Sequence, residues 1–176
     1  EVLKSSPPKI DIKYLEKFYW EKSQKVIAMS KPDSTVMQKE IPGLEVAIVP
    51  NGVDMEMFSN IAVRKHTRKR VLFVGNFKWL QNREAVMFLI SEIWPKIKSF
   101  VPDAKLWIVG RFPTLAIKNF DGTQDISVFE NVSDIRDAYA DCDVLLAPIY
   151  GPGGTRYKIL EAMASGCPVI CSNRTS

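Results

Sequence analysis

The second half of the sequence alternates short apolar runs with longer amphipathic segments, and this alternation constrains the fold more than any other feature. Helices are expected at 82–100, with a kink at Pro95, from Ser133 or Asp134 to about Ala140, and at 155–165. The apolar runs between them predict strands at Val71–Val74, Leu106–Val109, Ile126–Phe129, Val144–Ala147 and Val169–Cys171. Continuous apolar strands separated by helices are typical of a parallel sheet that is covered on both faces. The sequence therefore predicts an α/β fold with a doubly wound parallel sheet.

The first third of the chain predicts a separate, smaller part. A helix is expected at Asp11–Lys25, and strands are expected at Val26–Met29 and Val46–Val49. Ser30 is expected to cap a helix that reaches about Glu40, with Pro32 in its first turn. We expect residues 1–58 to be the remnant of a neighbouring domain, 59–69 a linker, and 70–176 a ligand-binding domain truncated at its C-terminus. The chain begins without Met and stops just after a strand, so it is expected to be a piece of a longer protein.

Ligands of open parallel sheets bind beyond the carboxyl ends of the strands. The segments that follow the expected strand ends should therefore converge on one crevice. They are 75–82, 110–113, 131–134 and 148–154.

A glycine-rich loop opens the last expected helix in the segment Gly151–Ser172, GPGGTRYKILEAMASGCPVICS. Free backbone N–H groups at a helix start favour an anion, and glycines let a phosphate approach closely. Lys158 adds a mobile positive charge, and the carboxylate of Glu161 could accept hydrogen bonds from sugar hydroxyls. These residues predict a nucleoside diphosphate site, although a solvated Lys–Glu pair on an ordinary helix has the same spacing.

Helix geometry predicts which way this polar pair points. At ~100° per residue, the polar and small side chains share one face, and the large apolar ones share another. The polar face is therefore expected to point away from the core and to leave room for a ligand. Its residues are Thr155, Lys158, Glu161, Ala162 and Ser165, and the apolar face holds Ile159, Leu160 and Met163.

Composition narrows the possible chemistry. The 176 residues are 46% hydrophobic and 25% charged, with a net charge of +4, which is ordinary for a globular protein. The basic run Arg64–Arg70 is interpreted as a solvated linker, and no nucleic-acid-binding motif accompanies it, so no nucleic-acid partner is expected. His66 is the only histidine, which excludes a Ser-His-Asp or Cys-His centre. No apolar run approaches the ~20 residues of a membrane span, and there is no signal-peptide pattern.

The cysteines do not predict a disulfide framework. There are three of them, Cys142, Cys167 and Cys171, and an odd number without paired spacing argues against one. A zinc site would need a second pair of ligands. The expectation is reduced, buried thiols.

At this point the residues resemble a known family. The segment GGTRYKILEAMASGCPVI is similar to the donor-binding signature of family-4 retaining glycosyltransferases of the GT-B fold, whose C-terminal half is a Rossmann-like domain. IVPNGVD at 48–54, with Phe58, resembles the end of the acceptor domain in these enzymes. VLFVG at 71–75, followed by KWLQN, resembles the first strand and helix of their donor domain, and the segments 104–110 and 128–147 continue in the same order. The resemblance covers about Val26 to Ser172.

The resemblance implies a role for each candidate residue of the donor site. Gly153, Gly154 and Thr155 match the positions beside the diphosphate, and Gly75 matches the turn after the first donor-domain strand. Lys158 would stabilise the leaving diphosphate, and Glu161 would hold the ribose hydroxyls. The candidates for the remaining contacts are Lys78, for positive charge near the diphosphate, and Val132 with Asn131, for backbone contacts to the base.

The sequence departs from the family pattern at two positions. Gly153 stands where many members have a second acidic residue that contacts the donor sugar. Asn76 stands where an Arg is frequent. The donor sugar therefore cannot be inferred from this sequence, and no residue of the chain is assigned as catalytic beyond the diphosphate role of Lys158.

The resemblance implies a nucleotide-sugar-dependent hexosyltransferase that retains the anomeric configuration, in polysaccharide or glycoconjugate biosynthesis. It implies no cofactor and no metal, a saccharide or lipid-linked acceptor bound by the missing domain, and a cytoplasmic location with peripheral membrane contact. This part alone is expected to bind donor without turning it over. The alternatives are a nucleotide-sugar epimerase of the same fold and a degenerate GT-B binding module. A dinucleotide-binding domain is disfavoured because GNFKWLQN lacks G-x-G-x-x-G.

Overall fold

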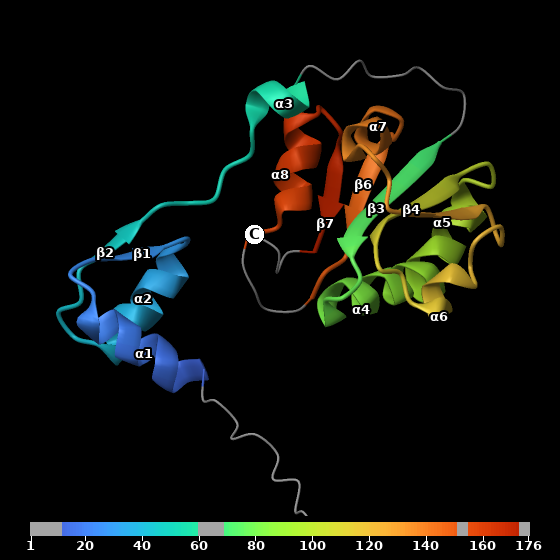
Figure 1. Cartoon of the computed structure of the whole chain (residues 1–176). Coiled ribbons are helices and arrows are strands. Elements are labelled where there is room, and N and C mark those ends of the chain that lie inside the picture. Colours follow the sequence, from blue (N-terminus) through green and yellow to red (C-terminus); the bar gives the residue numbers. More distant parts are fainter. Residues whose placement is uncertain (1–11, 60–68, 151–154, 173–176) are drawn as a thin grey trace, which may run out of the picture. The chain divides into compact units, whose positions relative to one another are not determined.

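A computed structural model describes residues 12–59, 69–150 and 155–172 (Figure 1). Contacts within the chain divide it into two units, one ending at Asn51 and the other beginning at Gly52. This division falls earlier in the sequence than the expected boundary after residue 58. In the described ranges, no helix has the length and apolarity that a membrane crossing requires.

The first unit contains two helices and two short parallel strands. They are α1 (Ile12–Lys22), β1 (Val26–Ala28), α2 (Lys31–Glu40) and β2 (Val46–Ile48), with Val26 opposite Val46. Helix α2 begins as predicted, because the Ser30 hydroxyl oxygen accepts a hydrogen bond from the Asp33 N–H at 3.2 Å. Pro32 occupies its first turn, where no backbone N–H is needed.

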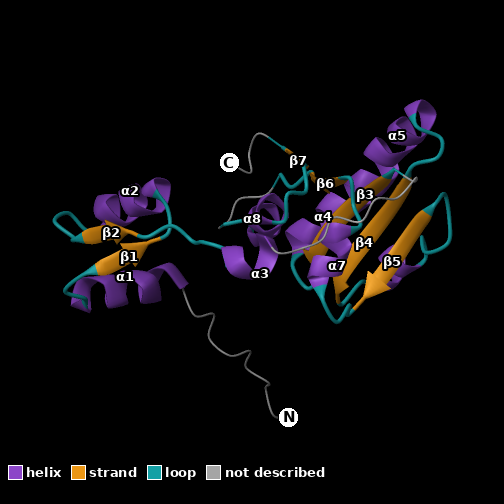
Figure 2. Cartoon of the chain, turned by 90° about the horizontal axis from the view of Figure 1, so that it is seen from above, coloured by secondary structure: helices purple, strands orange, loops and turns teal. Residues whose placement is uncertain are grey.

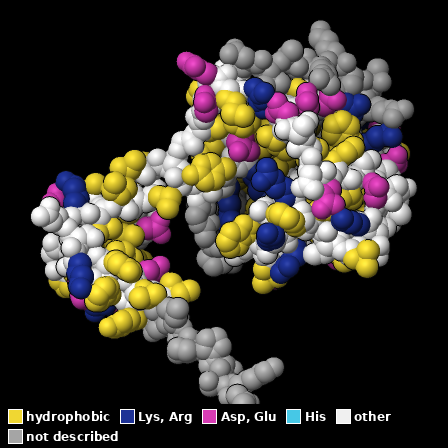
Figure 3. Space-filling model, viewed as in Figure 1, with side chains coloured by type: hydrophobic (Ala, Val, Ile, Leu, Met, Phe, Trp, Pro, Cys, Tyr) yellow, Lys and Arg dark blue, Asp and Glu magenta, His cyan; other side chains and the backbone are white. Residues whose placement is uncertain are grey.

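Helix α1 buries none of its residues. Its large side chains remain open to solvent, including Ile12, Tyr14 and Tyr19, which are 64–69% exposed. Figure 3 shows hydrophobic side chains spread over the surface of this unit. The first unit therefore leaves much of its apolar surface exposed to solvent.

The second unit is built on five strands, and all their pairings are parallel. Their order in the sheet is β5-β4-β3-β6-β7, so the chain starts in the middle and winds outward in both directions. This confirms the predicted doubly wound sheet, and β6 and β7 have the predicted bounds. The strands are β3 (Arg70–Asn76), β4 (Lys105–Arg111), β5 (Ile126–Glu130), β6 (Val144–Ala147) and β7 (Val169–Cys171).

Helices cover both faces of this sheet (Figure 2). On one face, α4 (Leu80–Phe88) and α5 (Trp94–Phe100) pack against side chains such as Phe73 and Ile108. On the other face, α7 (Ile135–Ala140) and α8 (Tyr157–Ala164) pack against Leu72, Val109 and Leu145. Adjacent strand residues point to opposite faces, so β3, β4 and β6 contribute to both apolar clusters, whereas β5 contributes to the first and β7 to the second.

The helix expected at 82–100 is interrupted before Pro95. A wider, π-helical turn, η1 (Leu89–Ile93), separates α4 from α5, and the Trp94 N–H donates to the Leu89 carbonyl five residues back. Proline has no N–H to donate and its ring would clash with the carbonyl four residues earlier. The widened turn relieves that clash, as π-bulges do.

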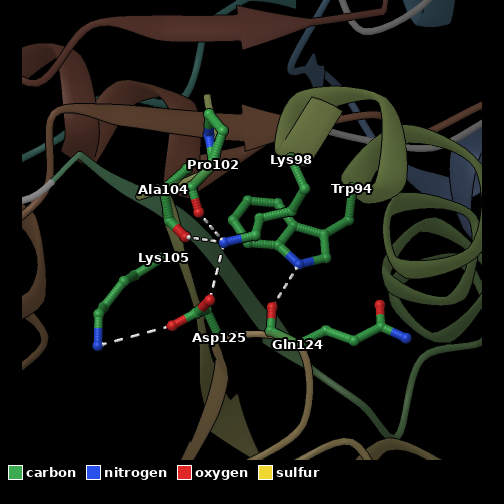
Figure 4. A network of polar contacts seen from close by, with 7 residues as sticks. All are labelled: Trp94, Lys98, Pro102, Ala104, Lys105, Gln124 and Asp125. Atoms are coloured by element: carbon green, nitrogen blue, oxygen red, sulfur yellow. Dashed lines mark hydrogen bonds and ion pairs between the residues drawn. The ribbon is translucent and has the colours of Figure 1, made fainter. Parts of the chain in front are cut away.

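A polar network secures the amino-terminal edge of the sheet (Figure 4). The ammonium of Lys98 donates to the carbonyls of Pro102 and Ala104 and to the carboxylate of Asp125, the last at 2.7 Å. The indole of Trp94 donates to the Gln124 carbonyl at 2.9 Å. The network thus holds the turn that leads into β5, where Gln124 and Asp125 both adopt positive φ. It lies at the end of the sheet away from the carboxyl ends of the strands.

The structure contains two helices that the sequence did not predict. One is α6 (Leu115–Lys118), and the other is α3 (Met55–Ser59), which lies at the end of the segment expected to be the remnant of a neighbouring domain. Phe58 of α3 is buried in the cluster beneath α7 and α8 and makes an edge-on contact with the Tyr139 ring. The start of the second unit is therefore part of its core.

Candidate functional site

A cavity of about 580 Å³ opens at the carboxyl ends of β3, β4 and β5. The segments after β3, β4 and β5 therefore converge as predicted. Of the fourth segment, 148–154, the described residues 148–150 are not among those that line the cavity, and 151–154 lie outside the described residues. Of the predicted site residues, the cavity brings together Gly75, Val132 and Glu161. Its other lining residues are Met57, Val74, Asn76, Gly110, Arg111, Asn131, Ser133, Asp134, Ile135 and Arg136. Gly153 and Gly154 lie outside the described residues.

Two glycines allow the close packing at the floor of this cavity. A Cβ at Gly110 would lie 1.7 Å from the Gly75 carbonyl oxygen, a distance that no side chain can adopt. A Cβ at Gly75 would lie 3.2–3.3 Å from atoms of Phe73 and Asn82. Gly110 is therefore required by the approach of β3 to β4, and Gly75 lets the start of α4 lie close to the strand.

Helix α8 turns its polar face toward the body of the unit, opposite to the prediction. Ala162 is completely buried and packs in the core, whereas Met163, expected on the core face, is 64% exposed. Ser165 is also buried, and its hydroxyl donates to the Glu161 carbonyl at 2.7 Å. The small side chains make room for the sheet and for α7 rather than for a ligand.

This orientation buries most of the Lys158 side chain. Its ammonium donates to the amide oxygen of Asn82 at 2.8 Å and lies 4.8 Å from the centre of the Phe73 ring. Burial lowers the pKa of Lys158 to about 7, with a smaller contribution from the nearby positive charge of Arg156. The Asn82 amide in turn donates to the Asn76 carbonyl at 2.8 Å. Lys158 thus connects α8 to the start of α4 and to the end of β3.

Glu161 lies on the cavity wall, and a buried tyrosine holds its carboxylate. The Tyr139 hydroxyl donates to Glu161 Oε2 at 2.9 Å. Burial is the main cause that raises the pKa of Tyr139, and the charge of Glu161 adds to it, so the phenol stays protonated and remains a donor. The carboxylate keeps lone pairs that face the cavity, where they could accept hydrogen bonds from vicinal hydroxyls.

The segment after β5 forms the opposite wall. Asn131 has a φ of +55°, a conformation that asparagine tolerates better than most residues, and its N–H donates to the Gly110 carbonyl at 3.1 Å. Asp134 caps α7 and forms a two-pronged ion pair with Arg136, which lowers the pKa of Asp134. Arg136 also donates to the Met57 carbonyl at 3.4 Å. These bonds hold the wall, including the exposed backbone at Val132.

The positive charge beside the cavity comes from residues that the sequence reasoning did not select. Lys78 is exposed on the loop after β3 and is not among the lining residues; its ammonium lies 4.0 Å from the centre of the Phe112 ring. Arg111 lines the cavity instead and has no side-chain hydrogen bond or ion pair within the described residues. The sequence could have indicated Arg111, because it directly follows Gly110 in a segment predicted to face the crevice.

Comparison with known proteins places these features in a family. The family model for glycosyl transferases group 1 matches residues 68–176. The phosphatidyl-myo-inositol mannosyltransferase of Mycobacterium tuberculosis is 30% identical over an alignment of 143 residues that covers 77% of this chain and 37% of that protein. The same enzyme of Mycobacterium leprae is 29% identical over the same length. The chain therefore spans little more than a third of these relatives.

Solved structures share the fold at low sequence identity. A glycosyltransferase from Rickettsia africae matches with a TM-score of 0.71 and 18% identity, over 96% of this chain and 49% of that one. WaaG, a glycosyltransferase of lipopolysaccharide biosynthesis, matches with a TM-score of 0.66 and 17% identity, over 84% and 44%. HepE of Anabaena, solved with UDP and glucose, matches with a TM-score of 0.61 and 15% identity, over 86% and 45%. Sequence and fold agree, and the chain belongs to the glycosyl transferases group 1 family.

Proposed function

We propose that this chain is the donor-binding part of a retaining glycosyltransferase and that its cavity binds a nucleoside diphosphate sugar. The observation that carries the proposal is the position of the Glu161 carboxylate, held by Tyr139 on the wall of a cavity at the carboxyl ends of three parallel strands. In doubly wound sheets, nucleotides bind at this edge, beyond the carboxyl ends of the strands.

The diphosphate would lie against the start of α8. Neither α8 nor α4 has a side-chain cap at its first turn. The Tyr157 and Ile159 N–H groups of α8 donate to the carbonyls of Thr155 and Arg156, and an anion would compete with these carbonyls for them. Arg156 and Lys158 add two positive charges that repel each other, and a bound diphosphate would relieve this repulsion. Thr155, Gly153 and Gly154 complete this part of the site in our proposal.

The nucleoside would extend from α8 toward the wall formed by the segment after β5. Glu161 accepts hydrogen bonds from the ribose hydroxyls, and the backbone at Val132 contacts the base. Gly75 has no side chain, which leaves space for the nucleotide at the floor of the cavity. Arg111 supplies positive charge inside the cavity. Lys78 could contact the diphosphate only if its ammonium moved away from the Phe112 ring.

The chemistry that follows is transfer of a hexosyl group with retention at the anomeric carbon. As the glycosidic bond breaks, negative charge accumulates on the leaving diphosphate, and Lys158 with the helix start would stabilise it. This charge stabilisation requires no metal ion or organic cofactor. We assign no further catalytic residue to this chain.

The acceptor belongs to the rest of the protein in this proposal. Residues 1–51, the first unit, would be part of the acceptor-side domain, and the chain alone would bind donor without turning it over. The name of the mycobacterial relatives, phosphatidyl-myo-inositol mannosyltransferase, supports a lipid acceptor. A saccharide acceptor, a cytoplasmic location and peripheral contact with a membrane are further parts of our proposal. UDP in the HepE structure supports a nucleotide-sugar donor.

Calorimetric titration of the purified chain with UDP, GDP, their hexose conjugates and pyrophosphate tests the proposal. Glu161→Ala should weaken nucleoside diphosphate binding by roughly ten- to hundredfold, the usual range for a hydrogen bond to a charged group, and leave pyrophosphate binding unchanged. Lys158→Ala should weaken binding of both ligands. Glu92→Ala, on the exposed surface of η1, is the matched control.

Two results would contradict the donor site. One is the absence of binding by any nucleoside diphosphate at millimolar concentration. The other is equal affinity of the parent chain and both variants, which would mean that Lys158 and Glu161 only stabilise α8. An epimerase remains disfavoured, since the cavity offers Glu161 and the ion-paired Asp134 but no histidine within the described residues.

A further inference from the structure

Two of the three cysteines meet in the core, although 25 residues separate them in the sequence. The sulfur atoms of Cys142 and Cys167 are 2.9 Å apart, and both residues are buried. Cys142 lies two residues before β6 and Cys167 two residues before β7, and these strands pair in parallel with Leu145 opposite Val169. Strand pairing therefore brings the two thiols together at the amino-terminal edge of the sheet.

The pKa values of the two thiols shift in opposite directions. The hydrogen bond between the two sulfur atoms lowers the pKa of Cys167 and, together with burial, raises the pKa of Cys142. Each sulfur also lies near a backbone carbonyl oxygen, Cys142 at 3.4 Å from that of Tyr139 and Cys167 at 3.5 Å from that of Pro168. The lower pKa favours Cys167 as the nucleophile of the pair, with Cys142 as the second thiol.

We propose that Cys142 and Cys167 are a redox pair that closes to an intramolecular disulfide under peroxide. In the first step the Cys167 thiolate attacks hydrogen peroxide, which leaves a sulfenic acid on Cys167 and releases hydroxide. In the second step the Cys142 sulfur attacks the sulfenic sulfur, a water molecule leaves, and the S–S bond forms. Two thiols have then lost two electrons, and one peroxide has become two water molecules.

The packing is compatible with this bond. A disulfide is about 2.05 Å long, so the sulfur atoms need to approach by only about 0.9 Å from their 2.9 Å separation. Oxidation should therefore need little rearrangement of the core. Hydrogen peroxide is close to water in size, and each cysteine retains a small exposed fraction of 5–7%.

The bond would close a loop that contains α8, with Lys158 and Glu161 between the two cysteines. Closing such a loop lowers the entropy of the unfolded chain and stabilises the fold. Oxidation should thus fasten the helix that carries the candidate donor site to the start of β6. The proposal depends on the two cysteines and not on the donor site, so it stands whether or not the cavity binds a nucleotide.

The test uses the full chain with Cys171→Ser, because Cys171 is exposed and is the remaining cysteine. The folded protein is treated with hydrogen peroxide, unfolded and alkylated with N-ethylmaleimide, and its mass is measured by mass spectrometry. We expect a mass loss of two hydrogens with no alkylation, and a thermal midpoint higher by about 5–10 °C that dithiothreitol reverses. Trypsin cleaves after Arg136, Arg156, Lys158 and Arg174, so the bond should link the peptides 137–156 and 159–174.

Single variants test the assigned roles. In Cys142→Ala with Cys171→Ser, dimedone should trap a sulfenic acid on Cys167, and in Cys167→Ala with Cys171→Ser no adduct should form on Cys142. Alkylation of both thiols after peroxide treatment would overturn the proposal, since the pair would then not have closed. A bond between two chains instead of within one, or a dimedone adduct on Cys142, would overturn it as well. Circular dichroism before treatment establishes that each variant is folded.

Discussion

At the residue scale, Lys158 links the pH of the solution to the stability of the second unit. In the folded chain its pKa is about 7, whereas its ordinary value is 10.5. Between these values the unfolded state binds more protons, so this group makes the free energy of unfolding rise with pH. Below pH 7, Lys158 is protonated in both the folded and the unfolded chain, so the free energy of unfolding is lowered by the full cost of burying its charge.

Lys158→Met should therefore stabilise the ligand-free chain at low pH. The free energy of unfolding should rise by a few kcal/mol at pH 6, because each unit by which the pKa is lowered corresponds to about 1.4 kcal/mol. The lost hydrogen bond to Asn82 reduces this gain. The gain should shrink as the pH approaches 10. Urea unfolding at pH 6, 8 and 10 measures this, with the exposed Lys96→Met as control. A stability difference that does not change with pH would show that Lys158 is not buried as a charge.

Tyr139 is the residue that positions the Glu161 carboxylate. Tyr139→Phe removes only the hydroxyl, so we expect about tenfold weaker binding of nucleoside diphosphate and no change for pyrophosphate. The variant should also bind 2′,3′-dideoxynucleoside diphosphate as the parent chain does, since the lost contact acts through the ribose hydroxyls. Titration calorimetry measures all three ligands, and Tyr157→Phe, on the exposed side of α8, is the control. A parallel loss of pyrophosphate binding would mean that Tyr139 only supports the fold.

At the element scale, the short helix α3 is an integral part of the second unit, although it lies next to the boundary between the units. Phe58 attaches it, because its side chain is buried in the core and contacts the Tyr139 ring. Arg136 adds a hydrogen bond to the Met57 carbonyl. The helix thus reaches both walls of the cavity, at Arg136 and, through Tyr139, at Glu161.

Phe58→Ala should lower the free energy of unfolding by about 3–5 kcal/mol, the usual cost of truncating a buried phenylalanine. Met55→Ala is the matched control, because Met55 lies in the same helix with a side chain that is 57% exposed. Chemical denaturation followed by tryptophan fluorescence compares the two. Equal stability of both variants would indicate that α3 is only a tether between the units.

At the scale of the whole molecule, the first unit should drive self-association. Its helix α1 exposes a row of apolar side chains and buries none. Exposed apolar patches of this kind favour contacts between molecules. Light scattering should show a mass that rises with protein concentration, and Tyr14→Lys with Tyr19→Lys should reduce this rise. Phe100→Lys, at a single exposed position of the second unit, should not. A monomer at all concentrations would contradict this expectation.

The sequence by itself determined the architecture of the second unit. The strands at Val144–Ala147 and Val169–Cys171 were predicted with the bounds that they have, as was the parallel pairing of the sheet. The cap at Ser30 and the disturbance before Pro95 were also predictable. These features depend on neighbouring residues: hydrophobic periodicity, a capping side chain and a missing N–H all act within a few positions. The crevice followed as well, because parallel strands place all their carboxyl ends at one edge.

Only the tertiary structure decided how the candidate site is held. The hydrogen bonds from Lys158 to Asn82 and from Tyr139 to Glu161 join residues that are 76 and 22 positions apart. The orientation of α8 also depended on its neighbours, since the face with the small Ala162 packs closely against the core and the face with Met163 cannot. Contacts between distant residues leave no local pattern in a single sequence. The local sequence of a helix does not determine which of its faces packs against the core, and only the packing of the folded chain does.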